Sequence, residues 1–513
     1  MKKIDFPFNI FLFFLYFSII LIFSVSIDLN RHWSSFADQE FTLAYNALLI
    51  NSGEPQEFNE HPGYFTIFFL SVFFKFCSFL EIFKHFNLSN IDFNNFDIEM
   101  QNVIYFTRIF SLTFNTLFLI LVFKILNFFS ENKIYTLLLS FLILFSIGTI
   151  NAAVNLRTDL LAMVFLLMSL LNLCYFHKND TKNSSFHLFF FFLLFFCSVL
   201  NKSQTFFFLP CILILTLFLK FKNNKNLIDK LSFSNKKYFL YTFLLFIYFL
   251  YFYYFYYKNL SYEIPKAKLK LNVIFILYNV FLTNIYFYLV FKKNKLRIIE
   301  NLIKVNILII FTFVTLKFIL FLIPSTNEDT FKTSFTNVMG ILTYINDLNP
   351  TKNMTFSDGL YKLINYNVPN IYFVWKEKFS TINYHSLLMT SSLLLNLFLK
   401  KTLEKKFFFN LACIGTFIFI FSINELRGAP QYFIYSDFFL ILSFSYFGSL
   451  SFIKYKNYYL ILFIFIIFFF TNENIQIYID TIKFQNLDLV CNSSYINDWH
   501  KKIPNYALNK VCF

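Results

Sequence analysis

Residues 158–176 read TDLLAMVFLLMSLLNLCYF, and residues 187–200 read HLFFFFLLFFCSVL. The first stretch is long enough to cross the hydrocarbon core of a bilayer as an α-helix, which takes about 17 to 25 mostly apolar residues. Its only charged residue, Asp159, stands near its start. Apolar runs of this kind recur along the whole chain, and such runs are stable where the surrounding solvent is lipid. The pattern therefore predicts an all-α integral membrane protein with many spans.

The composition excludes the main soluble classes. Of the 513 residues, 57% are hydrophobic and only 14% are charged, and the mean hydropathy is +0.57. A soluble domain carries roughly 25% charged residues. A soluble enzyme, a secreted disulfide scaffold and a disordered chain are therefore excluded.

The abundance of aromatic and basic residues has a simple explanation. The chain has 84 Phe and 32 Tyr but only 8 Gly and 3 Trp, and its abundant residue types have AT-rich codons, so the bias reflects the genome. In a soluble protein, a net charge of +15 would suggest binding to nucleic acid. In a polytopic membrane protein, Lys-rich loops instead orient the chain in the membrane. We therefore expect membrane lipids, and no nucleic acid, among its partners.

The apolar runs predict thirteen transmembrane helices. A fourteenth candidate, residues 63–84, contains Lys75 and Glu81 and follows an amphipathic segment over residues 38–50. The thirteen predicted spans cover residues 8–27, 105–124, 134–153, 158–176, 187–200, 205–221, 238–257, 271–291, 301–323, 385–399, 407–423, 432–451 and 457–471.

The charge of the loops orients these spans. If residues 63–84 do not span and the N-terminus is cytoplasmic, the Lys-rich connectors all fall on the cytoplasmic side, as the positive-inside rule requires. If residues 63–84 spanned, every later loop would change sides and the rule would be violated. We therefore predict that residues 63–84 form an interfacial helix in the first outer loop. The expected protein is a multi-pass inner or plasma membrane protein with its C-terminus outside.

This topology makes residues 1–471 one membrane domain and residues 472–513 a short outer tail. The two large outer loops cover residues 28–104 and 324–384, and the cytoplasmic connectors are all short and basic. No cytoplasmic segment could hold a nucleotide-binding domain, and the sequence contains no Walker or Rossmann glycine pattern. We expect no nucleotide cofactor, and we expect any chemistry to take place at the outer face.

The first outer loop carries the densest polar cluster, which includes Asp38 and Glu40. Two carboxylates at this spacing can face one site, where a carboxylate takes a proton from an attacking hydroxyl or amine, or binds a divalent cation. The alternative is that Asp38 caps a helix over residues 40–50, with Glu40 in its first turn. The next outer turn holds Arg157 and Asp159, which form either part of the same site or an ion pair at a helix N-terminus.

Three further cations are predicted at the outer face. Lys202 lies in a turn too short to leave the membrane surface, where its ammonium either holds a lipid phosphate or snorkels to the interface. Arg108 is predicted four residues into its helix, and Arg427 lies between two spans. Carboxylates beside such cations suit the transfer of a group from a membrane-embedded lipid phosphate to an acceptor.

The order of these features resembles the GT-C superfamily of polytopic glycosyltransferases, especially the branch with protein O-mannosyltransferases and lipid A aminoarabinose transferases. The resemblance covers residues 1–220, and beyond them only the topology is similar. One departure is Gly63, where the family has a second proline. The motifs that carry the resemblance are Asp38-Gln-Glu40, Glu60-His61-Pro62-Gly63, Arg108, Leu156-Arg157-Thr158-Asp159, Asn201-Lys202-Ser-Gln and Arg427…Tyr432.

The resemblance implies a membrane glycosyltransferase that moves a sugar from a polyprenyl-phosphate donor to a lipid, glycan or protein acceptor at the outer face. By the same resemblance, Asp38 is the general base on the acceptor nucleophile. Glu40 assists Asp38 or holds a metal, and Asp159 orients the acceptor or a metal. A divalent metal ion is thus left open as a cofactor.

The resemblance also assigns the remaining polar residues of the outer face. Lys202, Arg108 and Arg427 hold the departing lipid phosphate, while His61 and Arg157 line the site.

Two other classes of function stay open. A flippase or transporter of lipid-linked sugars would favour broken helices and polar residues at mid-membrane, and inverted repeats. An O-antigen-type polymerase or ligase would use a late outer loop, which here is residues 324–384, but that loop has few suitably arranged cations.

Cys491 and Cys512 are the only cysteines outside the apolar runs, and the topology places both in an oxidising compartment. We therefore predict a disulfide between them, which closes a loop of about 20 residues and stabilises the tail by roughly 3 kcal/mol.

Overall fold

The computed structural model describes residues 6–26, 29–36, 40–57, 63–130, 132–178, 184–222, 265–291, 298–322, 384–399, 404–425 and 433–454, with isolated positions between 461 and 476 and residues 502–504. Within these residues all of the regular secondary structure is helical. The predicted all-helical class is therefore confirmed for the described part of the chain.

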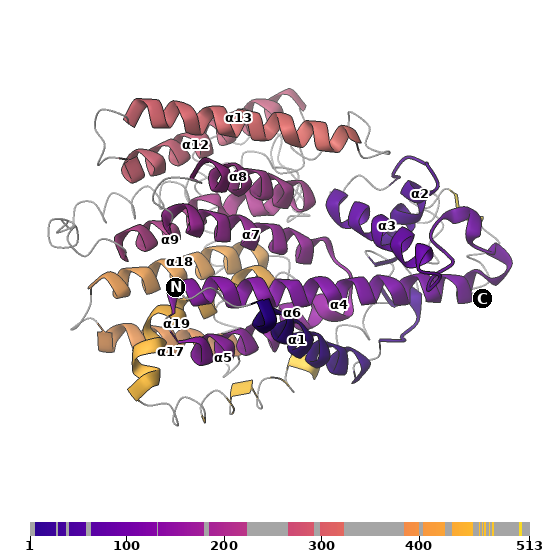
Figure 1. Cartoon of the computed structure of the whole chain (residues 1–513), viewed down its shortest axis with the longest axis horizontal. Coiled ribbons are helices and arrows are strands. Elements are labelled where there is room, and N and C mark those ends of the chain that lie inside the picture. The colour runs from indigo at the N-terminus through magenta and orange to yellow at the C-terminus, as the bar shows by residue number, and fades with distance from the viewer. Residues whose placement is uncertain are drawn as a thin grey trace, which may run out of the picture.

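Five described helices are long and apolar enough to cross a membrane. They pack side by side as a bundle, with their axes running across Figure 1. Each corresponds to a predicted span, although the helices extend a few residues beyond the apolar runs. The five are α1 (Phe6–Ser26), α4 (Phe96–Phe129), α7 (Thr158–Lys178), α8 (Ser184–Asn201) and α13 (Ile298–Leu322).

A sixth candidate span is broken. Helices α5 (Lys133–Leu144) and α6 (Ile147–Val154) meet at an angle of 67°, and Ser146 at the break is extended. The side-chain amide of Asn474 donates to the Phe145 carbonyl at 2.8 Å, which satisfies a backbone group at the break. The span predicted over residues 134–153 is thus made of two helices with a bend between them, because hydropathy does not register a change of direction inside an apolar run.

The later helices complete the bundle. The long helix α12 packs on α9 and α13, and α17 and α18 pack on α19. Predicted spans 238–257 and most of 457–471 lie outside the described residues, so thirteen spans remain a prediction. The later elements are η5 (Ser203–Phe208), α9 (Leu209–Lys222), α12 (Pro265–Phe291), α17 (Tyr384–Leu399), α18 (Glu404–Glu425) and α19 (Phe433–Lys454).

Contacts between helix ends show which ends of the helices lie together. The Phe129 ring at the end of α4 stacks on Phe409 near the start of α18, with centroids 4.9 Å apart. At the other end, the Tyr435 hydroxyl in the first turn of α19 donates to Asp159 in the first turn of α7. The starts of α7 and α19 therefore lie at one end of the bundle, and the end of α4 and the start of α18 lie together at the other. Which end faces the cytoplasm remains a prediction.

The described residues between α1 and α4, which belong to the predicted first outer loop, form a compact unit, called the cap, at one end of the bundle, on the right in Figure 1. The Trp33 indole donates to Asp97 at 2.7 Å and ties the loop to the start of α4. A separate hydrophobic core forms around Trp33, Tyr45 and Phe74. The cap comprises η1 (Trp33–Phe36), α2 (Thr42–Asn51), α3 (Tyr64–Phe79), η3 (Leu88–Asn90), η4 (Phe93–Asn95) and the first turns of α4.

Two sequence predictions about the cap need correction. All residues of α2 from Thr42 to Ile50 are buried, so this segment is not an amphipathic surface helix. Helix α4 begins at Phe96 rather than at residue 105, so Arg108 lies about three turns inside it instead of four residues from its start. The apolar run missed these first turns because polar residues such as Asp97 and Gln101 interrupt it. Helix α3 has 16 residues, and its interfacial placement remains a prediction.

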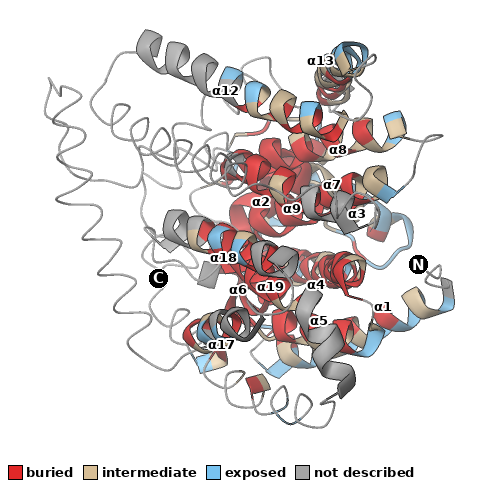
Figure 2. Cartoon of the chain, turned by 90° about the vertical axis from the view of Figure 1, so that its left-hand side faces the viewer, coloured by how far each residue is buried: buried red, intermediate tan, exposed pale blue. Residues whose placement is uncertain are grey.

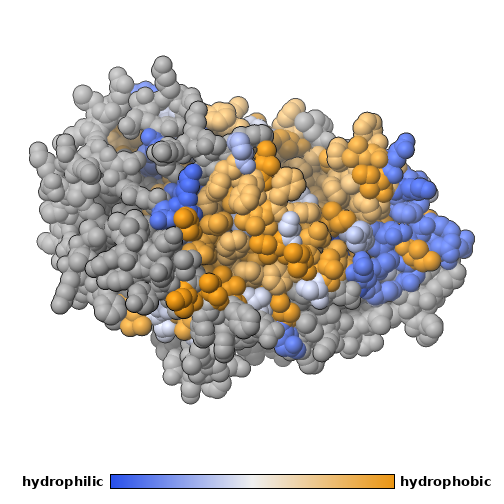
Figure 3. Space-filling view, turned by 60° about the horizontal axis from the view of Figure 1, so that its bottom comes forward, coloured by the Kyte–Doolittle hydropathy of each residue, from blue (hydrophilic) through white to orange (hydrophobic). Residues whose placement is uncertain are grey.

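The hydrophobic surface of the bundle is arranged as a membrane protein requires. Helices α1 and α13 are buried over only 22% and 17% of their most apolar windows, and both lie at the periphery of the bundle (Figure 2). Exposed side chains such as Phe14, Ile22, Ile307 and Phe318 give them apolar outer faces. In Figure 3 a hydrophobic band covers the described middle of the molecule, and hydrophilic residues gather at its right-hand end.

The C-terminal tail returns to the cap. The backbone N–H of Lys502 donates to the Tyr45 hydroxyl at 3.1 Å, and Ile503 belongs to the core of the cap. Burial raises the pKa of Tyr45, so its hydroxyl stays protonated and donates in turn to Glu57. The tail and the first outer loop therefore lie on the same side of the bundle, as the predicted topology requires.

Candidate functional site

The cap is attached to the bundle through a buried ion pair between Arg108 of α4 and Glu40. The Arg108 Nε atom lies 3.2 Å from both carboxylate oxygens of Glu40, and Nη2 lies 3.0 Å from Oε2. Its Nη1 atom donates to the carbonyl oxygens of Leu29 and Arg31 at 2.8 and 2.7 Å. Both charged side chains are fully buried. The Arg108 guanidinium is thus committed to protein acceptors.

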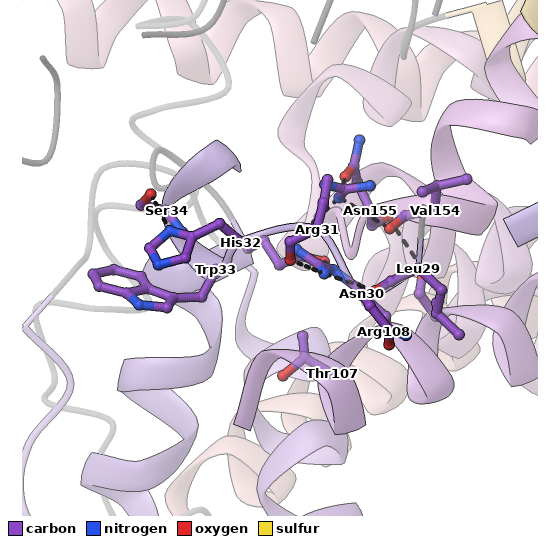
Figure 4. Close-up of polar contacts among 12 residues, drawn as sticks. Leu29, Asn30, Arg31, His32, Trp33, Ser34, Thr107, Arg108, Val154 and Asn155 are labelled. Atoms are coloured by element: carbon purple, nitrogen blue, oxygen red, sulfur yellow. Dashed lines mark hydrogen bonds and ion pairs between the residues drawn. The ribbon is translucent and has the colours of Figure 1, made fainter. Parts of the chain in front are cut away.

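Arg31 extends this pair toward the bundle. Its Nη2 atom lies 3.5 Å from Glu40 Oε2 and donates to the Val154 carbonyl at 3.2 Å. It also donates to the side-chain oxygen of Asn155, as Figure 4 shows. Val154 and Asn155 lie where α6 ends and the turn to α7 begins. The first outer loop is therefore joined directly to the turn that carries Arg157 and Asp159.

A second ionic cluster surrounds Asp159 in the first turn of α7. Arg157 Nε lies 3.6 Å from Asp159 Oδ2, and Lys202 Nζ lies 3.6 Å from Oδ1. The Tyr435 hydroxyl donates to Oδ1 at 3.0 Å. All four residues are buried, with Lys202 and Asp159 only 1% exposed. Lys202 therefore points toward Asp159, which is a correction to its predicted position at the lipid boundary.

Asn201 joins this cluster to α3. Its side-chain nitrogen donates to the Thr158 carbonyl at 2.6 Å, and its side-chain oxygen accepts from the Thr66 N–H at 3.0 Å. Gly63, which precedes α3, lies so close to Thr158 that an added Cβ would overlap the Thr158 methyl group. A larger residue at position 63 would therefore force the Thr158 side chain to move.

Several buried polar atoms near Asp159 make no hydrogen bond within the described residues. In native proteins such atoms are rare, and a cluster of them indicates a place where a polar ligand or water binds. Four of them lie within residues 155–159, in the α6–α7 turn and the first turn of α7. The atoms are Asn155 Nδ2, Arg157 Nε, Thr158 Oγ1, Asp159 Oδ2 and Gln204 Nε2.

The charges of the two clusters favour an anion over a cation. Four basic side chains face only two carboxylates here, which leaves a buried excess of positive charge within the described residues. Each carboxylate is already paired with Arg or Lys, and no three His, Cys, Asp or Glu side chains of the described chain come together as metal ligands. A phosphate group would balance this excess of positive charge.

The structure brings together five of the eight predicted site residues as two linked clusters: Glu40 with Arg108, and Arg157 with Asp159 and Lys202. The N-cap position of α2, for which the sequence offered Asp38 as an alternative role, is occupied by Phe41. Phe41 makes no side-chain cap hydrogen bond. The other predicted residues, Asp38, His61 and Arg427 with Cys491 and Cys512, lie outside the described residues.

Sequence reasoning missed four buried residues. Tyr435 and Arg31 contact the clusters directly, while His385 of α17 and Asp437 of α19 form a separate ion pair at 2.7 Å. An aspartate inside the apolar run 432–451 was a usable signal, because ionisable residues inside a span are usually functional or paired. Nothing in the sequence would have indicated that Tyr435 contacts Asp159.

Comparisons with protein-family models, with curated proteins and with solved structures find no match to this chain.

Proposed function

We propose that the protein is a membrane glycosyltransferase that moves a sugar from a polyprenyl-phosphate donor to an acceptor at the outer face. The observation that carries the proposal is the buried, positively charged cluster of Arg157, Asp159 and Lys202 at the cap end of the bundle. Its unsatisfied polar atoms suit a phosphate group, and its position at the ends of apolar helices suits a lipid-linked one.

The proposed reaction is a direct displacement. Asp38 takes the proton from the acceptor hydroxyl or amine, whose oxygen or nitrogen forms a bond to the anomeric carbon of the sugar. The bond between that carbon and the phosphate oxygen breaks, and the polyprenyl phosphate leaves with the electron pair. Lys202 and Arg157 stabilise the negative charge that develops on it, and Asp159 orients the acceptor.

Glu40 and Arg108 receive different roles from those expected. Both Glu40 oxygens accept from Arg108, and Arg108 donates to four protein acceptor atoms. A carboxylate and a guanidinium bound to each other in this way are poorly placed to take a proton or a phosphate. We therefore assign them to hold the segment around Arg31, which contacts the end of α6, against the bundle.

One observation favours a second candidate, a transporter of lipid-linked sugars. The 67° break between α5 and α6, with buried Asn151 beyond it, is the kind of interruption that substrate sites of transporters use. The two candidates differ in whether the bond between sugar and phosphate is broken.

The test uses purified full-length protein in liposomes that contain a radiolabelled polyprenyl-phosphate sugar. A glycosyltransferase moves the label to an added lipid, glycan or peptide acceptor and leaves unlabelled polyprenyl phosphate. Asp38→Asn is expected to abolish this transfer while thermal unfolding stays unchanged, because the amide keeps the size of the side chain but cannot act as a base. Transbilayer movement of intact labelled donor, with no transfer to any acceptor, would support the transporter and refute the enzyme.

A further inference from the structure

Tyr435 is the residue that ties the late helices to the proposed site. It lies in the first turn of α19 and is fully buried, and its hydroxyl donates to Asp159 Oδ1 at 3.0 Å. Two hundred and seventy-six residues separate it from Asp159. We propose that Tyr435 is a positioning residue that fixes the orientation of the Asp159 carboxylate, an inference that rests on the proposed function of the Asp159 cluster.

The distances around Asp159 distinguish the tyrosine from the cations. Arg157 Nε and Lys202 Nζ lie 3.6 Å from the carboxylate, beyond hydrogen-bonding distance. Tyr435 makes the only hydrogen bond that Asp159 has within the described residues. A hydrogen bond depends strongly on direction, whereas the attraction between charges at this distance depends on it much less. Tyr435 therefore fixes the rotation of the carboxylate. The Arg157 Nε atom makes no hydrogen bond within the described residues and can donate to a phosphate.

The backbone of the bundle holds Tyr435 in place. At Gly148 of α6 an added Cβ would lie 2.7 Å from the carbonyl carbon of Phe433, so only glycine lets α6 approach the first turn of α19 this closely. One turn further along α19, His385 of α17 pairs with Asp437 at 2.7 Å, and the His385 ring lies 4.8 Å from that of Phe433. The first turns of α19 thus contact both α6 and α17.

The alternative is that the hydrogen bond only stabilises the fold. Tyr16 offers a matched control, because it is also fully buried and its hydroxyl bonds Ser140 at 2.5 Å, away from both ionic clusters. Tyr435→Phe and Tyr16→Phe each remove one buried hydroxyl and keep the ring. Both are expected to lower thermal stability to a similar degree, and only the first is expected to change the kinetics of transfer.

The experiment is a double-mutant cycle on transfer, with Tyr435→Phe, Asp159→Asn and the double variant of the full-length protein in liposomes. Tyr435→Phe should raise the acceptor KM about 10- to 100-fold, the range for a hydrogen bond to a charged group, with a smaller change in donor KM. In the Asp159→Asn background the same change should alter acceptor KM by less than about twofold, because Tyr435 acts through the carboxylate. Tyr16→Phe should leave acceptor KM unchanged in both backgrounds.

Equal effects of Tyr435→Phe in the two backgrounds would overturn the inference and leave the proposed function standing. The same conclusion would follow if Tyr16→Phe raised the acceptor KM as much as Tyr435→Phe. A wild-type protein that transfers no label to any acceptor would instead refute the proposed function, and the positioning role with it.

Discussion

Lys202 and Asp159 illustrate what burial requires of single residues in this protein. An unpaired charge inside an apolar bundle is costly, and two opposite charges partly offset each other there. The pair lies 3.6 Å apart and both residues are 1% exposed, so neither is placed to snorkel into the interface. The burial of these two charged side chains is explained if they also bind a ligand that enters the site.

Lys202→Ala should therefore affect both stability and donor binding. The change leaves Asp159 with less compensation for its charge, and breaking a buried ion pair typically costs about 3 to 5 kcal/mol. A cation that binds the donor phosphate stabilises the bound donor as well as the transition state. The donor KM should therefore rise more than kcat falls. Thermal unfolding and transfer kinetics with varied donor concentration measure the two effects.

The matched control is Lys304→Ala. Lys304 pairs with Glu300 on α13, but the two side chains are 62% and 55% exposed, so this pair is worth at most about 1 kcal/mol. A donor KM that is unchanged in Lys202→Ala would remove Lys202 from the proposed phosphate site.

At the scale of elements, the cap and the bundle meet through a few polar contacts near the α6–α7 turn. Arg31 contacts Glu40 in the first outer loop, and Val154 and Asn155 at the end of α6. The planar guanidinium can donate in several directions at once, whereas the ammonium of lysine is a compact point charge on a flexible stem. Arg31 is thus suited to fix one element relative to another.

Arg31→Lys should loosen this connection while keeping the charge. The lysine cannot reproduce all three contacts, so transfer should slow by about tenfold or more, the effect of losing a hydrogen bond to a charged group. Hydrogen exchange followed by mass spectrometry should show faster exchange over residues 29–36 and unchanged exchange in α8. Unchanged exchange in residues 29–36 would contradict the structural role of Arg31.

The approach of α6 to α19 depends on one glycine. Gly148→Ala places a methyl group against the backbone of Phe433 and Ile434, which cannot move aside as a side chain can. We expect a loss of about 1 to 3 kcal/mol in unfolding free energy, typical of overpacking, and slower transfer because Tyr435 is displaced from Asp159.

Gly415→Ala is the control for this substitution. Gly415 lies in α18 with no atom within 4 Å of an added Cβ, so alanine should leave stability unchanged or raise it by up to about 1 kcal/mol. If both variants lost the same stability, the close approach of α6 and α19 would not be the cause.

At the scale of the whole molecule, both the cap and residues 502–504 lie at one end of the bundle. If that end is the outer face, a cysteine at position 502 is reachable from outside, whereas one at position 295 is not. Lys502 is half-exposed and forms a surface ion pair with Glu54, so replacing it should not disturb the fold.

The measurement is labelling of intact cells with a membrane-impermeant maleimide. Lys295→Cys and Lys502→Cys are compared in a background where Cys491 and Cys512 are serine, since the five cysteines of the described helices are buried. Only Lys502→Cys should react. Reaction at position 295 from outside would refute the predicted topology.

The sequence alone determined the helical class, most helix positions and the residues that had to be paired. A run of about 20 apolar residues has one stable form in lipid, and a charge beside such a run needs compensation, so both conclusions follow from local sequence. Only the tertiary structure decided which charges pair, that the span over residues 134–153 bends by 67°, and that α19 brings Tyr435 to Asp159. These features depend on contacts between helices far apart in the chain, and hydropathy carries no information about the rotation or direction of one helix against another.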